Sequence, residues 1–233
     1  MKYLFSLFIL CVLITSCSNN EHIMTLTGQV KGLKKGTLLL QKIEDTLLIT
    51  VDSVRVHGDS NFKFSEKITS PEMYYLYVRL KDGTLRDDRI AFFAEPGDIA
   101  INTTLTNFEV DAKITGSRNE IALDEYNKLM ERYTSKNLEN IQHNLEALQS
   151  GNDSIVKAIS KQNESLVASK YLMAVNFALN HSDYELAPYL MLSEVSDINI
   201  KYLDTVYTKL TPKIKDSKYG KALESFITER KKK

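Results

Sequence analysis

The sequence contains few of the residues on which redox and metal chemistry depend. Its 233 residues include two cysteines, four histidines and no tryptophan. Both cysteines, Cys11 and Cys17, lie close to the N-terminus, so the chain beyond them can form no disulfide and offers no thiol nucleophile or thiolate ligand. Such a fold must rely on its apolar core, for which 43% hydrophobic residues over this length is sufficient.

The chain also lacks an excess of charge of either sign. It carries 30 basic and 30 acidic residues. No overall field therefore attracts the protein to a polyanion, and we expect no nucleic acid among its partners. The apolar run from Tyr3 to Ile14 is too short to span a bilayer stably.

The N-terminus has the parts of a secretory signal peptide, namely a basic Lys2, the apolar run and small residues before Cys17. The segment Ile14-Thr15-Ser16-Cys17 resembles the lipobox of bacterial lipoproteins, in which the cysteine receives a diacylglyceryl group and cleavage occurs before it. We therefore predict a signal peptide over residues 1–16, lipid attachment at Cys17 and a polar tether over residues 17–22. Two or three acyl chains, palmitate among them, make a durable membrane anchor. An ordinary signal peptide with a chance cysteine is the alternative.

The residues after Cys17 bear on the membrane that holds the protein. Ser18 occupies the position at which, by analogy with proteobacteria, an aspartate would retain a lipoprotein in the inner membrane. Related bacteria use an acidic run to send lipoproteins to the cell surface, and Glu21 is the one acid between Cys17 and Ile23. We therefore expect the outer membrane, on its periplasmic face.

Residues 23–116 have the pattern of short strands separated by turn residues. Alternating polar and apolar residues, as at Phe62, Lys63 and Phe64, indicate strands that bury one face. Regular spacing of about ten residues favours an antiparallel sandwich or barrel. The predicted strands are Met24–Lys31, Gly36–Ile43, Leu47–Val56, Asn61–Thr69, Met73–Lys81, Arg89–Ala94, Asp98–Leu105 and Phe108–Thr115.

Residues 117–233 have helical periodicity instead, so the predicted fold class is α+β, with a β-sandwich-like domain followed by an all-helical domain. Ser117 and Glu120 form a capping box that begins the first helix. A break at Ser150-Gly151-Asn152 precedes a long helix from Ile155 to about Asn180. Its later part, Tyr171 to Leu179, is apolar nearly all round, which predicts burial. A second box, Ser182 to Glu185, predicts another helix start. Thr211-Pro212 and the segment from Tyr219 to Ile227 indicate further helices, and Leu138, Ile141, Leu145 and Leu148 form an apolar stripe.

Several strand motifs together resemble the DUF4369 domain, which is found mainly in Bacteroidota. The motifs are Thr27-Gly28-Gln29-Val30-Lys31-Gly32-Leu33, Gly36-Thr37-Leu38-Leu39-Leu40, Val51-Asp52-Ser53-Val54-Arg55-Val56, Asn61-Phe62-Lys63-Phe64, Ser70-Pro71-Glu72-Met73-Tyr74, Phe92-Phe93-Ala94-Glu95-Pro96-Gly97-Asp98 and Thr115-Gly116-Ser117. The resemblance covers about residues 25–117. It implies a domain that usually precedes a thioredoxin-like domain of the TlpA and alkyl hydroperoxide reductase class, with a helical linker similar to the segments around Asn180 and Tyr219.

This sequence departs from the family pattern at its end. The chain stops at Lys233 without the WCxxC-bearing thioredoxin domain that follows the helices in those proteins, so their redox activity carries over to no residue here. We expect no catalytic residues and no cofactor. The leading hypothesis is a non-catalytic binding or accessory module, with a thioredoxin-like envelope protein as a candidate partner. The alternative is the N-terminal half of a thiol-disulfide oxidoreductase system whose thioredoxin domain is on a separate chain.

The sequence also lacks other catalytic patterns, in agreement with this expectation. The histidines, His22, His57, His143 and His181, have no spacing typical of a metal site. The sequence contains neither a GxSxG nucleophile elbow nor a glycine-rich phosphate loop.

Two surface features carry further hypotheses. Exposed aromatics among Tyr74, Tyr75, Tyr77, Phe92 and Phe93 would suit a sugar or peptide, but burial of both sets by the helical half is the favoured interpretation. The basic C-terminal end could attract anionic headgroups, although lysines near helix ends are usually solvated. It comprises Lys209, Lys213, Lys215, Lys218, Lys221 and Arg230 to Lys233.

Four Asp-Ser/Thr-apolar triplets resemble the acceptor signal of the general O-glycosylation system of exported Bacteroidota proteins. They contain Thr46, Ser53, Ser154 and Thr205. A glycan needs an exposed acceptor, which favours Thr46 and Ser154 because both lie next to predicted loops. The alternative is that these residues merely make turns and caps.

Overall fold

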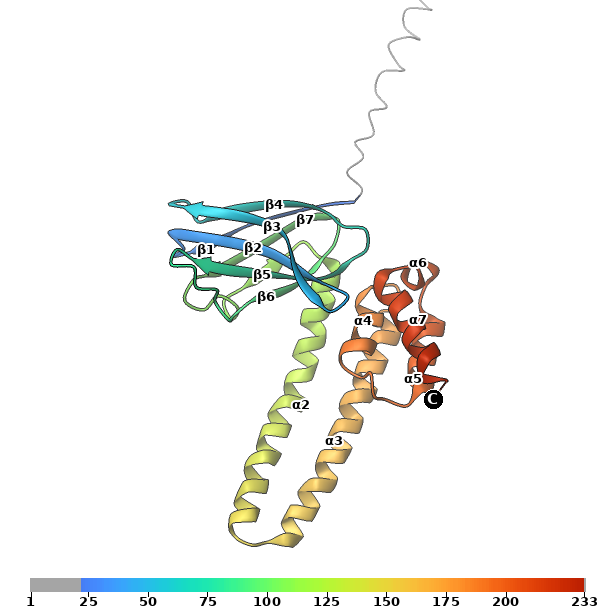
Figure 1. Cartoon of the computed structure of the whole chain (residues 1–233). Coiled ribbons are helices and arrows are strands. Elements are labelled where there is room, and N and C mark those ends of the chain that lie inside the picture. Colours follow the sequence, from blue (N-terminus) through green and yellow to red (C-terminus); the bar gives the residue numbers. More distant parts are fainter. Residues whose placement is uncertain (1–21, 233) are drawn as a thin grey trace, which may run out of the picture.

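The computed structural model describes residues 22–232, and these form a β-sandwich followed by helices (Figure 1). The eight strands of this part of the chain are β1 (Ile23–Lys31), β2 (Lys35–Glu44), β3 (Leu47–His57), β4 (Asn61–Lys67), β5 (Glu72–Leu80), β6 (Ile90–Ala94), β7 (Gly97–Thr104) and β8 (Lys113–Thr115). The helices of the same part are α2 (Arg118–Gln149), α3 (Asp153–Asn180), α4 (Leu186–Ser193), α5 (Ile200–Lys209), α6 (Pro212–Lys215) and α7 (Lys218–Arg230). The predicted α+β class is confirmed.

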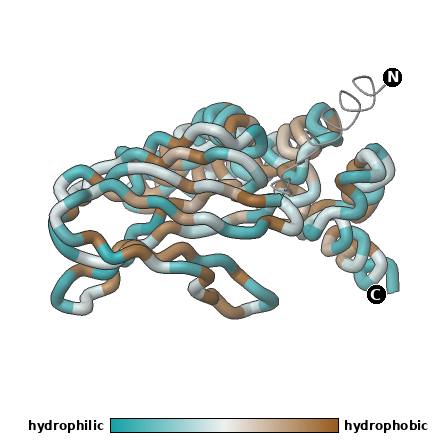
Figure 2. The backbone as a smooth tube through the Cα atoms, turned by 90° about the horizontal axis from the view of Figure 1, so that it is seen from above, coloured by the Kyte–Doolittle hydropathy of each residue, from teal (hydrophilic) through white to brown (hydrophobic). Residues whose placement is uncertain are grey.

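The strands form two four-stranded sheets with one apolar core between them. The first has the order β4-β1-β7-β8 and the second the order β3-β2-β5-β6. Period-two alternation places Leu26 of β1 and Phe64 of β4 in the same core as Leu76 of β5 and Phe92 of β6. The same alternation is visible as alternating hydropathy along the strands in Figure 2.

One strand pair departs from the antiparallel expectation. β1 pairs with β4 antiparallel but with β7 parallel, in a register that places Gly28 opposite Ile101. The cause is the connection before β7: the chain leaves β6 of the second sheet and enters β7 of the first after Glu95 and Pro96 alone. β7 therefore crosses from sheet to sheet and has no hairpin partner before it.

The predicted strand from Phe108 to Thr115 is correct only at its end. Residues 106–111 form turns, and β8 comprises three residues. Phe108 is nevertheless fully buried in the sandwich core, and its carbonyl accepts a 2.7 Å hydrogen bond from the Thr103 hydroxyl. Phe108 is therefore a core residue that a turn supplies. The pattern of apolar residues in the sequence does not distinguish such a residue from one in a buried strand.

The helices form a long hairpin and a compact group beside its base. α2 and α3 run antiparallel away from the sandwich, and α4 to α7 pack near the sandwich end of α3 (Figure 1). A second apolar core joins these helices to the outer face of the second sheet, since it contains Met73 of β5 and Phe93 of β6 together with Leu190 and Leu223. The sheet is thus covered by helices on the face opposite the sandwich core.

Helix starts follow local capping, with one exception. The side chains of Ser117, Asn152 and Thr211 accept hydrogen bonds from the first turns of α2, α3 and α6, as the sequence predicts or allows. The predicted start at the second box is wrong, because residues 181–185 form turns and α4 begins at Leu186 with no side-chain cap.

Candidate binding surface

The predicted lipid-attachment residue lies before the described part of the chain. The signal peptide over residues 1–16 and Cys17 fall outside residues 22–232, so lipidation stays a prediction. The hydrogen bonds of the sandwich begin at His22, whose carbonyl accepts a 2.8 Å hydrogen bond from the amide of Ile68.

The two candidate glycan acceptors both lie at the surface. Thr46 is exposed in the turn between β2 and β3, next to Asp45, whose φ of 54° is left-handed. Ser154 is exposed in the first turn of α3. Ser53 and Thr205 are exposed as well, but Ser53 lies within a paired strand and the Thr205 hydroxyl donates to the carbonyl of Lys201 in α5, so both are in regular structure and not in a turn or first helical turn. Modification itself stays a prediction.

The aromatic residues of the second sheet are divided between the two cores. Tyr74 and Phe92 point into the sandwich, whereas Phe93 packs edge-on against Tyr189 and Tyr219 of the helices, with ring centroids 5.8 and 6.1 Å apart. This confirms that the helical half covers this part of the sheet. Tyr75 is half-buried.

Tyr77, Tyr75 and Arg89 form a small cluster at the margin of that covered face. Tyr77 is 5% exposed, and its hydroxyl accepts a 2.9 Å hydrogen bond from Arg89. The same guanidinium lies 5.0 Å from the ring centre of Tyr75. These contacts occupy the arginine, so the aromatics do not form the open sugar or peptide site considered from the sequence.

A buried polar cluster connects the sandwich to the start of α2. The fully buried Asn119 donates from Nδ2 to Glu95 at 2.6 Å and to Glu185 at 3.0 Å, and its Oδ1 accepts from the amide of Leu186. Glu95 also accepts from the amide of Arg118. The polar groups of these buried side chains are therefore paired with one another and not with solvent. The cluster links the end of β6, the start of α2 and the start of α4, which are distant in sequence. The Glu185 carboxylate therefore accepts a hydrogen bond from Asn119 and does not form the helix cap predicted for it.

Glu120 has a role that the capping box did not predict. Its amide donates to the Ser117 hydroxyl at 3.1 Å, as expected, but its carboxylate accepts a 2.7 Å hydrogen bond from the amide of Phe93 on the edge strand β6. Burial raises the pKa of Glu120 to about 7, opposed by this hydrogen bond and assisted by Asp124 and Glu95. The edge of the second sheet is thus covered by a carboxyl group from α2.

The basic C-terminal end is largely engaged in contacts within the protein. Lys218 pairs with the buried Glu72 of β5, while Lys221 and Lys231 pair with Asp216 at 3.2 Å and Asp204 at 2.5 Å. Arg230 donates to the carbonyls of residues 196 and 198. These pairings leave less free positive charge for a headgroup than the sequence alone indicates.

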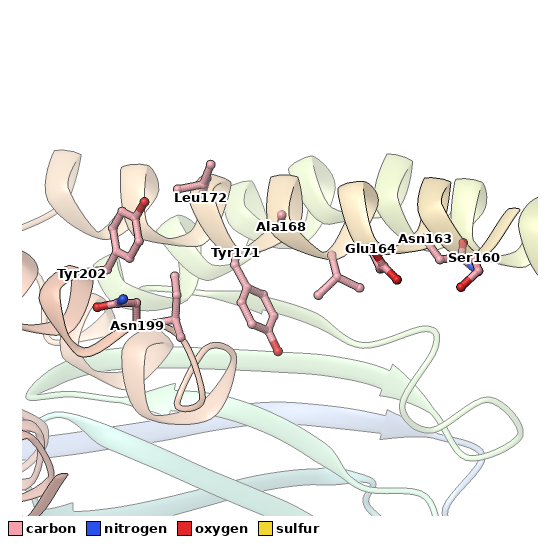
Figure 3. Close-up of a pocket in the computed structure, with 10 residues that line it drawn as sticks. Ser160, Asn163, Glu164, Ala168, Tyr171, Leu172, Asn199 and Tyr202 are labelled. Atoms are coloured by element: carbon pink, nitrogen blue, oxygen red, sulfur yellow. The ribbon is translucent and has the colours of Figure 1, made fainter. Parts of the chain in front are cut away.

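An open groove of about 700 Å³ runs along α3 beside α5 (Figure 3). Tyr171, Glu164 and Ser160 point to the same side of α3 in this view. The lining residues are Ser160, Asn163, Glu164, Val167, Ala168, Tyr171, Leu172, Ile198, Asn199 and Tyr202.

The groove is apolar and accessible along its middle. The side chains of Val167, Leu172 and Tyr202 are each between 40% and 48% exposed. A hydrogen bond to Asp197 raises the pKa of the Tyr171 phenol at the same surface. The sequence predicted burial of the apolar segment from Tyr171 to Leu179 on all sides. The structure buries Ala174, Val175, Phe177 and Ala178 there and leaves Leu172 open in the groove.

The apolar stripe predicted near the end of α2 is also accessible. Leu138, Ile141, Leu145 and Leu148 are 62%, 46%, 54% and 56% exposed. The side of α2 that faces α3 is occupied instead by Asn140 and Ala147, which are buried.

The described residues contain neither a cluster of metal ligands nor a membrane-spanning helix. Among residues 22–232, no three or more His, Cys, Asp or Glu side chains gather as a metal site would require. No helix within that range combines the length and the apolar character needed to cross a bilayer. His181 has a structural contact instead: its Nδ1 lies 2.9 Å from the carbonyl oxygen of Phe177 at the end of α3.

Comparison with known families identifies a match to the N-terminal part of the chain. Residues 24–123 match the family described as "Domain of unknown function (DUF4369)". The match covers the sandwich and the first residues of α2, in agreement with the resemblance in the strand motifs. A comparison with curated proteins finds no match to the chain.

Proposed function

We propose that the protein is an envelope lipoprotein that acts as a non-catalytic binding or accessory module. In this proposal Cys17 carries the lipid, the outer membrane holds the protein on its periplasmic face, and the groove between α3 and α5 receives a partner. The groove is the observation that carries the proposal.

The size and lining of the groove suit an apolar segment of another protein. Its volume of about 700 Å³ falls within the range of about 300–1,000 Å³ typical of binding sites. Val167 and Leu172 are among its apolar lining residues, and Glu164 and Asn199 are among its polar ones. A thioredoxin-like envelope protein remains the candidate partner because the strand motifs resemble a domain that usually precedes one.

The short tether would hold the sandwich near the bilayer and leave the helices accessible. His22 follows Cys17 by five positions, and an extended chain of that length spans at most about 18 Å. The 32 residues of α2 rise by about 48 Å. Met24 at the start of β1 pairs with Gly97, and Thr115 just before α2 pairs with Ala100, so the described chain begins at the same end of the first sheet as α2. From that end the hairpin runs away from the sandwich (Figure 1). A partner could therefore reach the outer part of the hairpin at a distance from the anchor.

Substitution of Cys17 tests the anchor. Cys17→Ala should leave an unprocessed or soluble species, whereas the matched variant Cys11→Ala should be processed and sediment with membranes as the native protein does. The measurement is membrane fractionation combined with mass spectrometry of the N-terminus. An unmodified mature N-terminus downstream of Cys17 on the native protein would contradict the anchor.

Site-specific photo-crosslinking tests the groove. A photoreactive residue at Leu172 should give a discrete adduct in cells, and the same residue at the exposed Ala222 of α7 should not. Val167→Glu in the Leu172 variant should abolish the adduct. The same adducts from both positions would reject the groove as the binding surface. Mass spectrometry of the adduct would then show whether the partner contains a thioredoxin domain.

A further inference from the structure

The exposed stripe on α2 has the spacing of a helix-pairing seam. Leu138, Ile141, Leu145 and Leu148 are separated by three, four and three residues, which is the a/d pattern of a coiled coil. About half of each side chain is exposed. Nothing in residues 22–232 covers them, since α3 contacts a different side of α2.

The stripe is limited in length and has neutral margins. The preceding a and d positions are Glu131 and Thr134, so the apolar seam extends over four residues only. The e and g positions beside it carry amides without charge: Asn137, Gln142, Asn144 and Gln149. Charged residues at these positions usually select a partner of opposite charge. Their absence here removes the like-charge repulsion that identical helices would otherwise suffer.

We propose that this stripe binds the same stripe on a second copy of the chain, with the two α2 helices antiparallel about a two-fold axis. In a two-fold interface each copy uses the same residues. The three-four-three spacing then places Leu138 of one copy against Leu148 of the other, and Ile141 against Leu145. A shift by one heptad would set two of the four apolar residues against Glu131 and Thr134, so one register is favoured.

The position of the sandwich favours the antiparallel arrangement. The sandwich lies at the start of α2, and the stripe lies close to the other end of this helix (Figure 1). Antiparallel pairing therefore places the two sandwiches at opposite ends of a four-helix assembly, where they cannot collide. It also sets the dipoles of the paired helices in opposition.

The interface is small, which sets the strength expected. A stable interface typically buries about 800 Å² on each partner, and four half-exposed side chains provide less. We therefore expect a reversible dimer that forms only at high protein concentration, toward about 1 mM in free solution. This inference does not depend on lipidation or on the groove.

Sedimentation equilibrium of a chain beginning at residue 22 tests the proposal. Both apolar cores lie between Met24 and Ile227, so this chain retains every residue that stabilises the fold. Its average mass should rise above the monomer mass, toward that of a dimer, as the concentration approaches about 1 mM. Ile141→Gln with Leu145→Gln should weaken dimerisation by at least about tenfold. The matched control, Val167→Gln with Leu172→Gln, alters groove residues of similar exposure and should change it less than about twofold.

Introduced cysteines test the orientation, because this chain contains none of its own. An equimolar mixture of Leu138→Cys and Leu148→Cys should form a disulfide-linked heterodimer under mild oxidation, faster than either variant forms a homodimer. Faster homodimers of each variant would overturn the antiparallel arrangement. A monomer at all concentrations, or loss of the dimer in the groove control alone, would overturn the proposal.

Discussion

Asn140 of α2 donates a 2.6 Å hydrogen bond to Oδ1 of Asn163 of α3, within the seam of the helical hairpin. Asn140 is 1% exposed, so its amide depends on this partner. A polar pair in an otherwise apolar seam costs little when both members are satisfied, and it disfavours other registers in which they are not. The pair therefore specifies how the two helices are aligned.

Removal of one member of this pair should destabilise the protein. Asn140→Ala leaves the Asn163 side chain without its partner and should lower the free energy of unfolding by about 1–3 kcal/mol. The double variant Asn140→Leu with Asn163→Leu should recover most of the loss because no polar group is then left unpaired. Urea denaturation measures both. Equal losses in the single and double variants would contradict this role.

Glu120 should make stability depend on pH. Its pKa is about 7 in the folded protein, above the ordinary value of 4.5, because burial disfavours the charged carboxylate. The folded state thus retains a proton that the unfolded state loses, so stability should fall as pH rises from 4.5 to 7 and then level off. The total change attributable to this group is on the order of 3 kcal/mol.

Glu120→Gln should remove this pH dependence, since the amide keeps an acceptor for the Phe93 amide and does not ionise. Its stability relative to the native protein should increase between pH 5 and pH 8. The control Glu125→Gln alters an exposed carboxylate on the same helix and should leave the profile unchanged. Parallel profiles for the native protein and Glu120→Gln would contradict the burial argument.

Gly28 should be among the least replaceable residues of the sandwich. A Cβ at this position would lie 1.8 Å from the carbonyl oxygen of Ile101, in the parallel pairing of β1 with β7. Gly28→Ala should therefore lower the free energy of unfolding by at least about 3 kcal/mol. Gly83→Ala is a useful comparison: its Cβ would meet nothing within 4 Å, and the cost arises from a φ of 91° alone. A smaller loss at Gly28 than at Gly83 would contradict the close approach.

The exposed acceptors Thr46 and Ser154 should carry the glycans if the protein is O-glycosylated. Intact-mass measurement of the protein from its native host should show a sugar-sized increment beyond the lipid. Thr46→Ala with Ser154→Ala should remove this increment, and Ser53→Ala with Thr205→Val should preserve it. The absence of any sugar mass on the native protein would reject the modification, and an undiminished mass on the first variant would reject the choice of sites.

The sequence predicts the sandwich well because strand alternation is a local signal. Seven of the predicted strands correspond to β1 to β7, and the alternation of Phe62 and Phe64 with Lys63 identifies the core face of β4 directly. The helix from Ser117 is predicted for the same reason, since its cap is made by residues three apart.

The errors arise where distant contacts override local preference. Glu185 should have capped a helix that begins near Ser182, but the buried amide of Asn119 holds its carboxylate and α4 begins later. The carboxylate of Glu120 is likewise held by Phe93, which is 27 residues away. The groove was missed for a related reason: apolar residues on nearly every side of the segment from Tyr171 to Leu179 predict burial, and only the arrangement of α5 shows that Leu172 stays open.

The parallel pairing of β1 with β7 restricts the order in which the chain can fold during synthesis or export. The second sheet needs only residues 35–94, so its strands can pair as soon as that segment emerges. β1 leads the chain but cannot gain its parallel neighbour until residues 97–104 have followed, and this pairing closes a loop of about 70 residues whose entropy must be lost first. Non-local pairings of this kind slow folding. The N-terminal strand, which would lie closest to a membrane anchor, should therefore complete its sheet last.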